Sequence, residues 1–143
     1  MKILVSACLL GCPCRYDGKS KINSELVSAL KKHEVVPFCP EIYGGLPTPR
    51  PAAEIKNGRV MTIDGRDVTN EYKKGADECV KLALLLNIEM CVLQDRSPSC
   101  GVGIIHNGDF DGGLVKGMGM TALALENAGI KAVPASEAMD LLR

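Results

Sequence analysis

Short apolar runs that end at glycine- or proline-rich turns constrain the fold of this chain most strongly. We expect strands at 2–7, 34–38, 90–93 and 131–133. The first run is almost entirely apolar, which is typical of a strand buried on both faces. Segments with apolar residues at helical spacing separate the four runs. This alternation predicts one three-layer α/β domain over residues 1–143, with a mainly parallel, Rossmann-like sheet.

The segments between these strands carry signals for helices, a hairpin and a long loop. Four helices are expected. Their caps or ranges are a cap at Asn23 or Ser24, a cap at Asp67 or Thr69, the range 121–127, and a cap at Ser136. A minor strand is expected at 60–63, and Asn-Gly and Asp-Gly steps predict a hairpin or turn at 104–113. The stretch 39–58 contains several prolines and the pair Gly44-Gly45. We therefore expect it to be a long functional loop without regular structure.

The composition argues against two classes of partner. Seventeen basic residues balance seventeen acidic ones, aromatic residues make up 3%, and tryptophan is absent. Nucleic-acid binders usually combine a basic surface with stacking rings, so we expect no dedicated nucleic-acid surface and a small substrate instead. The longest apolar stretch is far shorter than the roughly 20 residues that span a bilayer. With no signal-peptide features at the start, we expect a cytoplasmic protein without a membrane partner; the oligomeric state is left open.

Three of the seven cysteines directly follow three of the predicted strands. They are Cys8, Cys39 and Cys100, and each lies in a turn with glycine or proline. Right-handed crossovers bring the carboxyl ends of parallel strands to one edge of the sheet, so we expect the three thiols to converge there as metal ligands. None belongs to the tight Cys-x-x-Cys pairs of zinc fingers or ferredoxins, so only the fold can assemble such a site. The alternative for each is a small buried hydrophobic residue.

The chemistry of sulfur restricts the metals that such a site can hold. Sulfur-only ligation favours zinc or an iron-sulfur cluster over calcium or magnesium. Three thiolates without an evident fourth ligand leave one zinc position, or one iron of a cubane cluster, open for water or substrate. Cys12 and Cys14 are interpreted as additional ligands or a redox couple, and Cys79 and Cys91 as core residues.

Polar side chains close to these cysteines in the sequence are candidates for catalysis and substrate binding. They are Arg15 and Asp17 after Cys8, Glu41 and Arg50 after Cys39, and Ser97 and Ser99 before Cys100. A carboxylate beside a metal can activate water or move a proton, and a guanidinium fork can orient an anionic or carbonyl group. Asp17-Gly18 is also a common turn pair, and the two serines can instead stabilise their turn. His33 and His106 are assigned no role.

Five short motifs, in order, resemble the thiouracil desulfidase family, TudS, over essentially the whole chain. They are SACLLG at 6–11, RYDG at 15–18, CPE at 39–41, GGLPTPR at 44–50 and SPSCG at 97–101. The resemblance implies a [4Fe-4S] cluster held by Cys8, Cys39 and Cys100. It also implies that the fourth iron is free to take the sulfur of a thiolated pyrimidine.

The resemblance further implies a non-redox desulfuration. The iron polarises the carbon-sulfur bond, a carboxylate directs water onto the ring carbon, and sulfide leaves bound to the cluster. Catalytic roles are carried over to Asp17, Glu41, Ser97 and Ser99, without deciding which carboxylate is the base. One departure is Gln94, where relatives often have lysine. Two alternatives remain: a non-catalytic metal-binding or sensor domain, and a thiol redox protein that uses Cys12 and Cys14.

Overall fold

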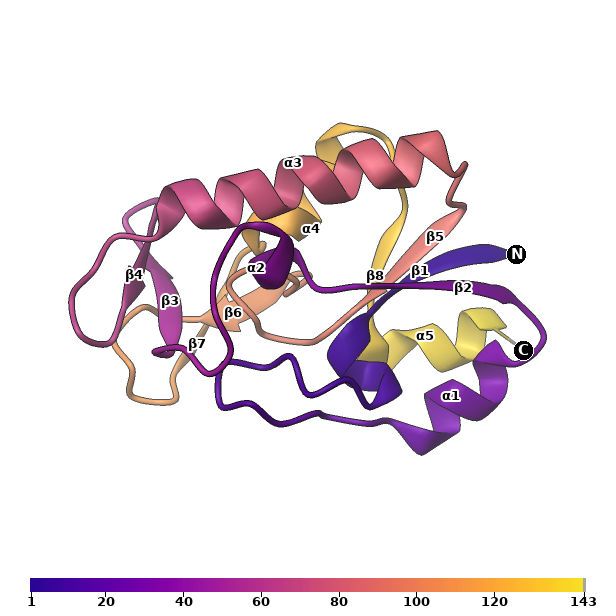
Figure 1. The fold of residues 1–143 in the computed structure, drawn as a ribbon, viewed down its shortest axis with the longest axis horizontal. Helices are drawn as coiled ribbons and strands as arrows, with labels where there is room; N and C mark the ends of the chain where they lie inside the picture. Colours follow the sequence, from indigo (N-terminus) through magenta and orange to yellow (C-terminus); the bar gives the residue numbers. More distant parts are fainter. Residues whose placement is uncertain (143) are drawn as a thin grey trace.

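The structure is a computed structural model that describes residues 1–142. Its centre is a four-stranded parallel sheet with the strand order β2-β1-β5-β8 (Figure 1). The strands are β1 (Lys2–Ser6), β2 (Glu34–Phe38), β5 (Met90–Leu93) and β8 (Ala132–Pro134). The sequence predicts all four with small shifts at their ends, so the expected parallel sheet is confirmed.

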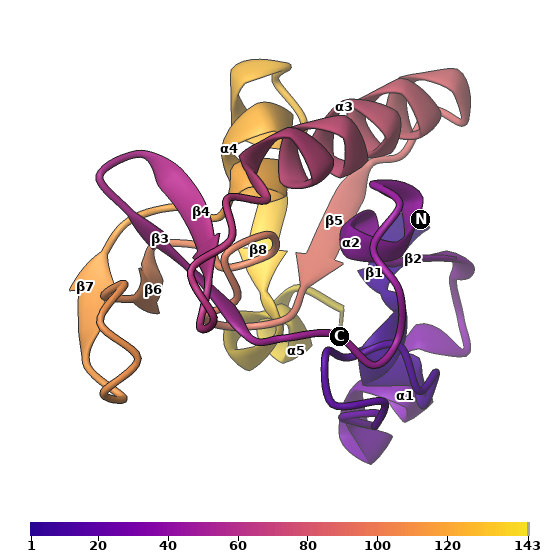
Figure 2. The same ribbon diagram turned by 60° about the vertical axis from the view of Figure 1, so that its left-hand side comes forward.

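Helices cover both faces of this sheet and complete three layers (Figures 1 and 2). On one face lie α1 (Ser24–Leu30) and α5 (Ala135–Leu142). On the other face lie α3 (Thr69–Leu85) and α4 (Met120–Asn127). This arrangement confirms the α/β fold class expected from the sequence.

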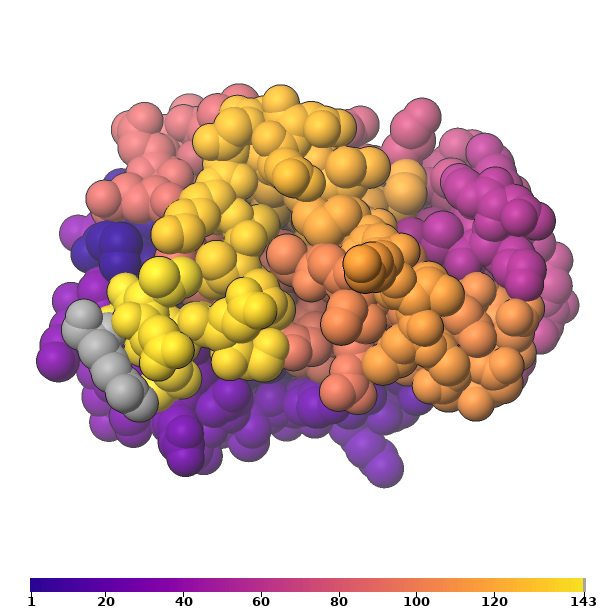
Figure 3. All heavy atoms as spheres, turned by 180° about the vertical axis from the view of Figure 1, so that it is seen from behind, coloured from indigo at the N-terminus to yellow at the C-terminus, as the bar shows by residue number. Residues whose placement is uncertain are grey.

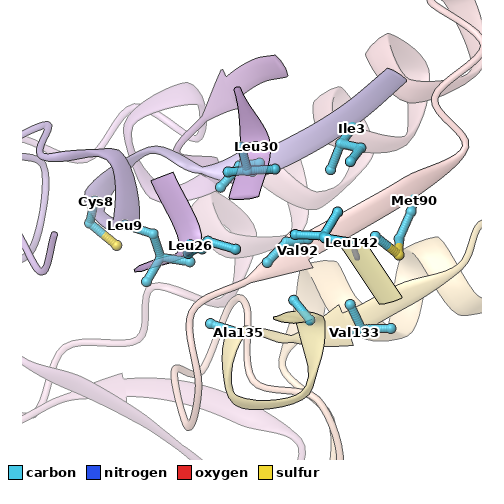
Figure 4. Packing of buried hydrophobic residues seen from close by; sticks show 12 residues of the cluster. Ile3, Cys8, Leu9, Leu26, Leu30, Met90, Val92, Val133, Ala135 and Leu142 are labelled. Carbon is cyan, nitrogen blue, oxygen red and sulfur yellow. The ribbon is translucent and has the colours of Figure 1, made fainter. Parts of the chain in front are cut away.

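The alternation of side chains along β1 explains why both faces need a helical layer. Ile3 and Val5 pack with α1 and α5, whereas Leu4 between them packs with α3 and α4. Successive residues of a strand point to opposite faces of the sheet. A strand that is apolar on both faces therefore needs a layer of helices on each face. Figure 4 shows the first of these clusters, with Leu26 and Val92 between the sheet and the helices.

The strand order creates a topological switch point between β1 and β5. From β1 the chain continues to β2 on one side of the sheet, and from β5 it continues to β8 on the other. Open α/β sheets bind ligands in the crevice that forms at the carboxyl ends of the strands at such a point. The segments that follow β1 and β5 are therefore the expected walls of a site.

Two small antiparallel hairpins lie beyond this edge, on the left in Figure 1. They are β3 (Ala53–Lys56) with β4 (Arg59–Thr62), and β6 (Ile104–His106) with β7 (Leu114–Lys116). The expected hairpin at 104–113 and the strand near 60–63 are thus confirmed. Glu54 joins the hairpins, because its Oε1 accepts hydrogen bonds from the backbone N–H groups of Gly108 at 3.0 Å and Phe110 at 3.2 Å.

The expectation of a structureless loop over 39–58 is wrong. This stretch contains strand β3 and a one-turn helix, α2 (Pro40–Tyr43), with proline at its first position, where its fixed φ suits a helix. Two glycines let α2 touch α3. A Cβ on Gly44 would lie 2.0 Å from the carbonyl oxygen of Glu71, and a Cβ on Gly75 would lie 1.9 Å from that of Pro40.

Two of the expected helix starts have side-chain hydrogen bonds. Asn23 Oδ1 accepts the N–H of Leu26 at 3.0 Å, so Asn23 caps α1 as predicted. Before the longest helix, Asp67 Oδ1 accepts the N–H of Thr69 at 2.9 Å, but the N-cap position is Val68, so neither Asp67 nor Thr69 is the cap that the sequence suggests. These bonds satisfy backbone donors that lack partners inside a helix.

The carboxyl-terminal helix begins two residues earlier than a cap at Ser136 would place it. Helix α5 starts at Ala135, and the N–H of Ser136 donates to Asp95 Oδ1 at 3.4 Å, so Ser136 is not the cap. Seen from behind, α4, β8 and α5 form much of the surface (Figure 3). No helix within residues 1–142 is long and apolar enough to cross a membrane.

Candidate metal and substrate site

A cavity of about 320 Å³ opens at the carboxyl edge of the sheet. Its walls come from the segments after β1, β2 and β5 and from both hairpins. Cys8, Cys39 and Cys100 all line it, together with Cys14. The parallel fold therefore brings together the three thiols that lie far apart in the sequence.

Each of these three cysteines is held by the structure that follows its strand. Cys8 lies in a short 3₁₀ helix, Ala7–Leu10, which the sequence analysis does not anticipate. Its Sγ is 4.0 Å from Gln94 Oε1. Cys39 stands at the N-cap of α2, and Cys100 is buried in the turn that follows β5. The local structure after each strand therefore determines where each thiol lies.

The thiols in the cavity are close enough to influence each other's pKa. The hydrogen bond with Cys39 lowers the pKa of Cys14, but the bond with Cys8 and burial raise it to about 11. The contact with Cys14 and burial raise the pKa of Cys39 above its usual value, and burial raises the pKa of Cys100 to about 12. Because metals bind the thiolate, loading a cluster here must release protons.

The donor set fits an iron-sulfur cluster better than one metal ion. Sulfur ligands select zinc or iron-sulfur clusters. No three His, Cys, Asp or Glu side chains within residues 1–142 are arranged to hold a single ion. A cluster of several irons tolerates thiolates that are spaced around a cavity, so Cys8, Cys39 and Cys100 suit the larger group.

Glu41 lines the same cavity, and both of its carboxylate oxygens have partners. Arg50 Nη2 donates to Oε2 at 2.6 Å, and the Tyr72 hydroxyl donates to Oε1. Burial on its own would lower the pKa of Arg50, but the charge of Glu41 and the hydrogen bond to it leave that pKa above its ordinary value. This ion pair fixes the position of the Glu41 carboxylate in the cavity wall.

Arg50 itself does not line the cavity. Nη1 donates to the Pro47 carbonyl at 3.2 Å and to Thr48 Oγ1 at 3.0 Å, and Nη2 also donates to the Cys14 carbonyl at 2.9 Å. These bonds place the guanidinium behind Glu41, where it orients the carboxylate. The sequence makes Arg50 a candidate for substrate contact, but its guanidinium donates to protein oxygens instead.

Of the first polar pair, Arg15 lines the cavity and Asp17 does not. Asp17 Oδ2 lies 3.8 Å from Arg15 Nη1, and its Oδ1 accepts the N–H of Lys19 at 3.0 Å. The latter bond is typical of the turn that the Asp17-Gly18 pair also predicts. Asp17 therefore restrains Arg15 and the turn from outside the cavity.

The two serines also have different positions. Ser97 lines the cavity, and its Oγ accepts the N–H groups of Ser99 and Cys100, both at 3.0 Å. Ser99 is buried outside the cavity lining, and its hydroxyl is 2.9 Å from that of Thr121. Both serines thus hold the turn that carries Cys100.

The family model for 2-thiouracil desulfurase matches residues 3–137. The chain belongs to the 2-thiouracil desulfurase family. The resemblance inferred from its motifs is confirmed. The uncharacterised protein YbbK of Bacillus subtilis (strain 168) is 37% identical over 150 residues, which cover 98% of this chain and 99% of that protein.

A solved structure shows the same similarity in three dimensions. It is a [4Fe-4S]-dependent thiouracil desulfidase, TudS, with 45% sequence identity and a TM-score of 0.91. The match covers 98% of this chain and 94% of that one. Family membership and fold therefore agree along almost the whole sequence.

Some residues of the cavity wall are not recognisable as site residues from the sequence of this family member. Tyr72 on α3 and His106 on β6 both line the cavity. Tyr72 belongs to no local sequence motif. Only its position on the side of α3 next to α2 indicates that it is part of the site. His106 lies at the end of a hairpin strand, and its Nδ1 is buried without a hydrogen-bond partner within residues 1–142. Only the packing of the hairpins and α3 against the sheet brings these side chains to the site.

Proposed function

We propose that this chain is a [4Fe-4S]-dependent desulfidase that removes sulfur from a thiolated pyrimidine of the thiouracil class. The observation that carries the proposal is that Cys8, Cys39, Cys100 and Glu41 line one cavity at the switch point of the sheet. Family membership and the 45% identical desulfidase structure support it.

In this proposal the three cysteines hold the cluster. Cys8, Cys39 and Cys100 supply three thiolates, and the absence of a fourth assigned ligand leaves one iron for the substrate. When bound, the cluster supplies a Lewis acid for the sulfur atom of the substrate. Cys14 lies beside two of these thiols and is not needed as a ligand.

The reaction replaces the carbon-sulfur double bond by a carbon-oxygen double bond without a change of oxidation state. A thione and water give a carbonyl and hydrogen sulfide, so both protons of the water must leave its oxygen. Glu41 is the group placed to accept the first of them as the water attacks the ring carbon. Arg50 holds the carboxylate through an ion pair at 2.6 Å, so Glu41 stays in the wall beside the cavity.

Other polar residues of the wall have supporting roles in the proposal. Arg15 lines the cavity and can donate to a ring carbonyl or to an anionic oxygen of the substrate. Ser97 and Ser99 keep the Cys100 turn in place, and of these two only Ser97 lines the cavity. Glu41 rather than Asp17 is the proposed base, since Asp17 lies outside that lining.

The decisive experiment measures metal and product in protein prepared without oxygen. We expect about four irons and matching acid-labile sulfide per chain, and release of sulfide and uracil from 2-thiouracil. Cys8→Ala, Cys39→Ala and Cys100→Ala should each lose iron and activity. Cys12→Ser is the matched control, because Cys12 is exposed and does not line the cavity.

Other results distinguish the alternatives. Stoichiometric zinc with no sulfide release would favour a non-catalytic metal-binding domain. Activity that disappears in Cys12→Ser but survives in Cys100→Ala would favour a thiol redox protein. A fully loaded cluster that releases no sulfide from thiolated pyrimidines would refute the proposed reaction while leaving the cofactor assignment intact.

A further inference from the structure

The proposed base is clamped by residues from two different parts of the fold. Arg50 reaches Oε2 of Glu41 from the segment that follows α2. Tyr72 reaches Oε1 from the first turns of α3, which belongs to the crossover between β2 and β5. One hydrogen bond would leave the carboxylate free to turn, because the last torsion of glutamate is broad. Two bonds, one to each oxygen, fix its plane.

We propose that Tyr72 is a positioning residue for desulfuration, whose hydroxyl holds Glu41 in the orientation needed to accept a proton from water. The inference rests on the proposed role of Glu41 as the base. Tyr72 lines the cavity beside Glu41 and is only 3% exposed. A tyrosine hydroxyl buried to this extent needs a hydrogen-bond partner, and the carboxylate is the partner that the structure provides.

The contact between α2 and α3 makes this hydrogen bond a built feature of the fold. A Cβ on Gly75 would lie only 1.9 Å from the carbonyl oxygen of Pro40. A Cβ on Gly44 would lie only 2.0 Å from the carbonyl oxygen of Glu71. Backbones in such contact leave little freedom between Glu41 on α2 and Tyr72 on α3. The pair is therefore held by two helices rather than by flexible side chains.

The ring and the hydroxyl of Tyr72 have separate roles. The ring packs with Val60 and Val68 in a small core cluster next to the β3–β4 hairpin. The hydroxyl contacts the carboxylate, and burial followed by the charge of Glu41 raises the pKa of Tyr72 above its usual value. The phenol thus stays protonated and remains a donor. Removing only the oxygen tests the positioning role and keeps the core contact.

The test is Tyr72→Phe in the cluster-loaded enzyme, with Tyr43→Phe as the matched control. Tyr43 lies on the same helix as Glu41, is 54% exposed, stacks on Phe38 and does not line the cavity. In Tyr72→Phe we expect kcat for sulfide release to fall about tenfold, as for loss of one hydrogen bond to a charged group, with KM and iron content unchanged. Tyr43→Phe should match the unmodified enzyme.

A double variant separates positioning from a general structural effect. In a Glu41→Gln background, Tyr72→Phe should produce no further decrease of kcat, because Tyr72 acts through Glu41. A crystal structure of loaded Tyr72→Phe should show the Glu41 carboxylate rotated while Arg50 still contacts it. If Glu41→Gln leaves too little rate to measure, this structure and the single-variant kcat decide.

Several results would overturn the inference. They are an unchanged kcat in Tyr72→Phe, a loss of iron that accounts for the lower rate, and a further full decrease in the Glu41→Gln background. Failure of the proposed function has a different signature, because the unmodified loaded enzyme would then release no sulfide at all. If the unmodified enzyme is active and Tyr72→Phe has the same kcat, only the positioning role is refuted.

Discussion

Removing the charge of Arg50 should destabilise the protein far more than removing a charge at its surface. The Arg50 side chain is 3% exposed, and its hydrogen bonds reach Glu41, Cys14, Pro47 and Thr48. Removing one partner of a buried ion pair costs about 3–5 kcal/mol. Because Glu41 is 18% exposed and keeps its bond from Tyr72, we expect about 3 kcal/mol for Arg50→Met.

Two further variants test the physical origin of this loss. In Arg50→Met/Glu41→Gln no unpaired carboxylate remains, so the double variant should recover about 1 kcal/mol or more relative to Arg50→Met. Arg59→Met is the surface control. Arg59 Nε lies 2.9 Å from Asp67 Oδ2, but the two side chains are 55% and 40% exposed. An exposed pair contributes about 0–1 kcal/mol, so Arg59→Met should cost no more than that.

The assay is urea unfolding followed by far-ultraviolet circular dichroism. All variants are compared as reduced, cluster-free protein without oxygen, so that differences in cluster loading do not enter the free energy. Equal m-values show that the same surface is exposed in each unfolding transition. The reasoning fails if Arg50→Met loses no more stability than Arg59→Met, or if the double variant is less stable than Arg50→Met.

Three other substitutions test the base, the helix contact and a cap. Glu41→Gln should keep its iron and lower kcat for sulfide release by about 10²-fold or more, as for loss of a general base; a normal rate would exclude Glu41 from that role. Gly75→Ala should lose about 3 kcal/mol in urea unfolding, because its Cβ would lie 1.9 Å from the Pro40 carbonyl oxygen. Wild-type stability would show that α2 moves aside freely. Asn23→Ala should lose about 1 kcal/mol through the missing bond to Leu26, and an unchanged urea midpoint would contradict the cap.

The parallel sheet is predictable because its signals are local. Three successive buried residues of β1, Ile3, Leu4 and Val5, are apolar on both faces, and Asn23 marks the start of α1 with a side chain that caps it. Helix α2 is different, since an isolated single turn is unstable in water. It depends on contact with α3 through Gly44 and Gly75, which lie far apart in the sequence. Local sequence patterns do not indicate that contact, so the sequence predicts no regular structure for the segment that contains α2.

The same distinction explains which site residues the sequence reveals. Cys8, Cys39 and Cys100 are recognisable because each follows a strand, and the topology then brings them to one cavity. Tyr72 cannot be recognised in this way. It lies on a helix whose position over the cavity depends on the crossover, and its ring also looks like an ordinary core residue.

The position of Glu41 also shows that the segment between β2 and α3 contributes to the site as well as connecting the two elements. A parallel crossover from β2 to β5 needs only a helix, yet this one also contains α2 and the β3–β4 hairpin. Those additions supply the carboxylate, while α3 supplies the tyrosine that contacts it. The proposed base is consequently fixed against the crossover helix, whereas Cys8 and Cys100 follow strands of the sheet. Displacing α2 from α3 should therefore move Glu41 and Cys39, at the N-cap of α2, without moving Cys8 or Cys100, so the helix contact supports both the proposed base and one proposed cluster ligand.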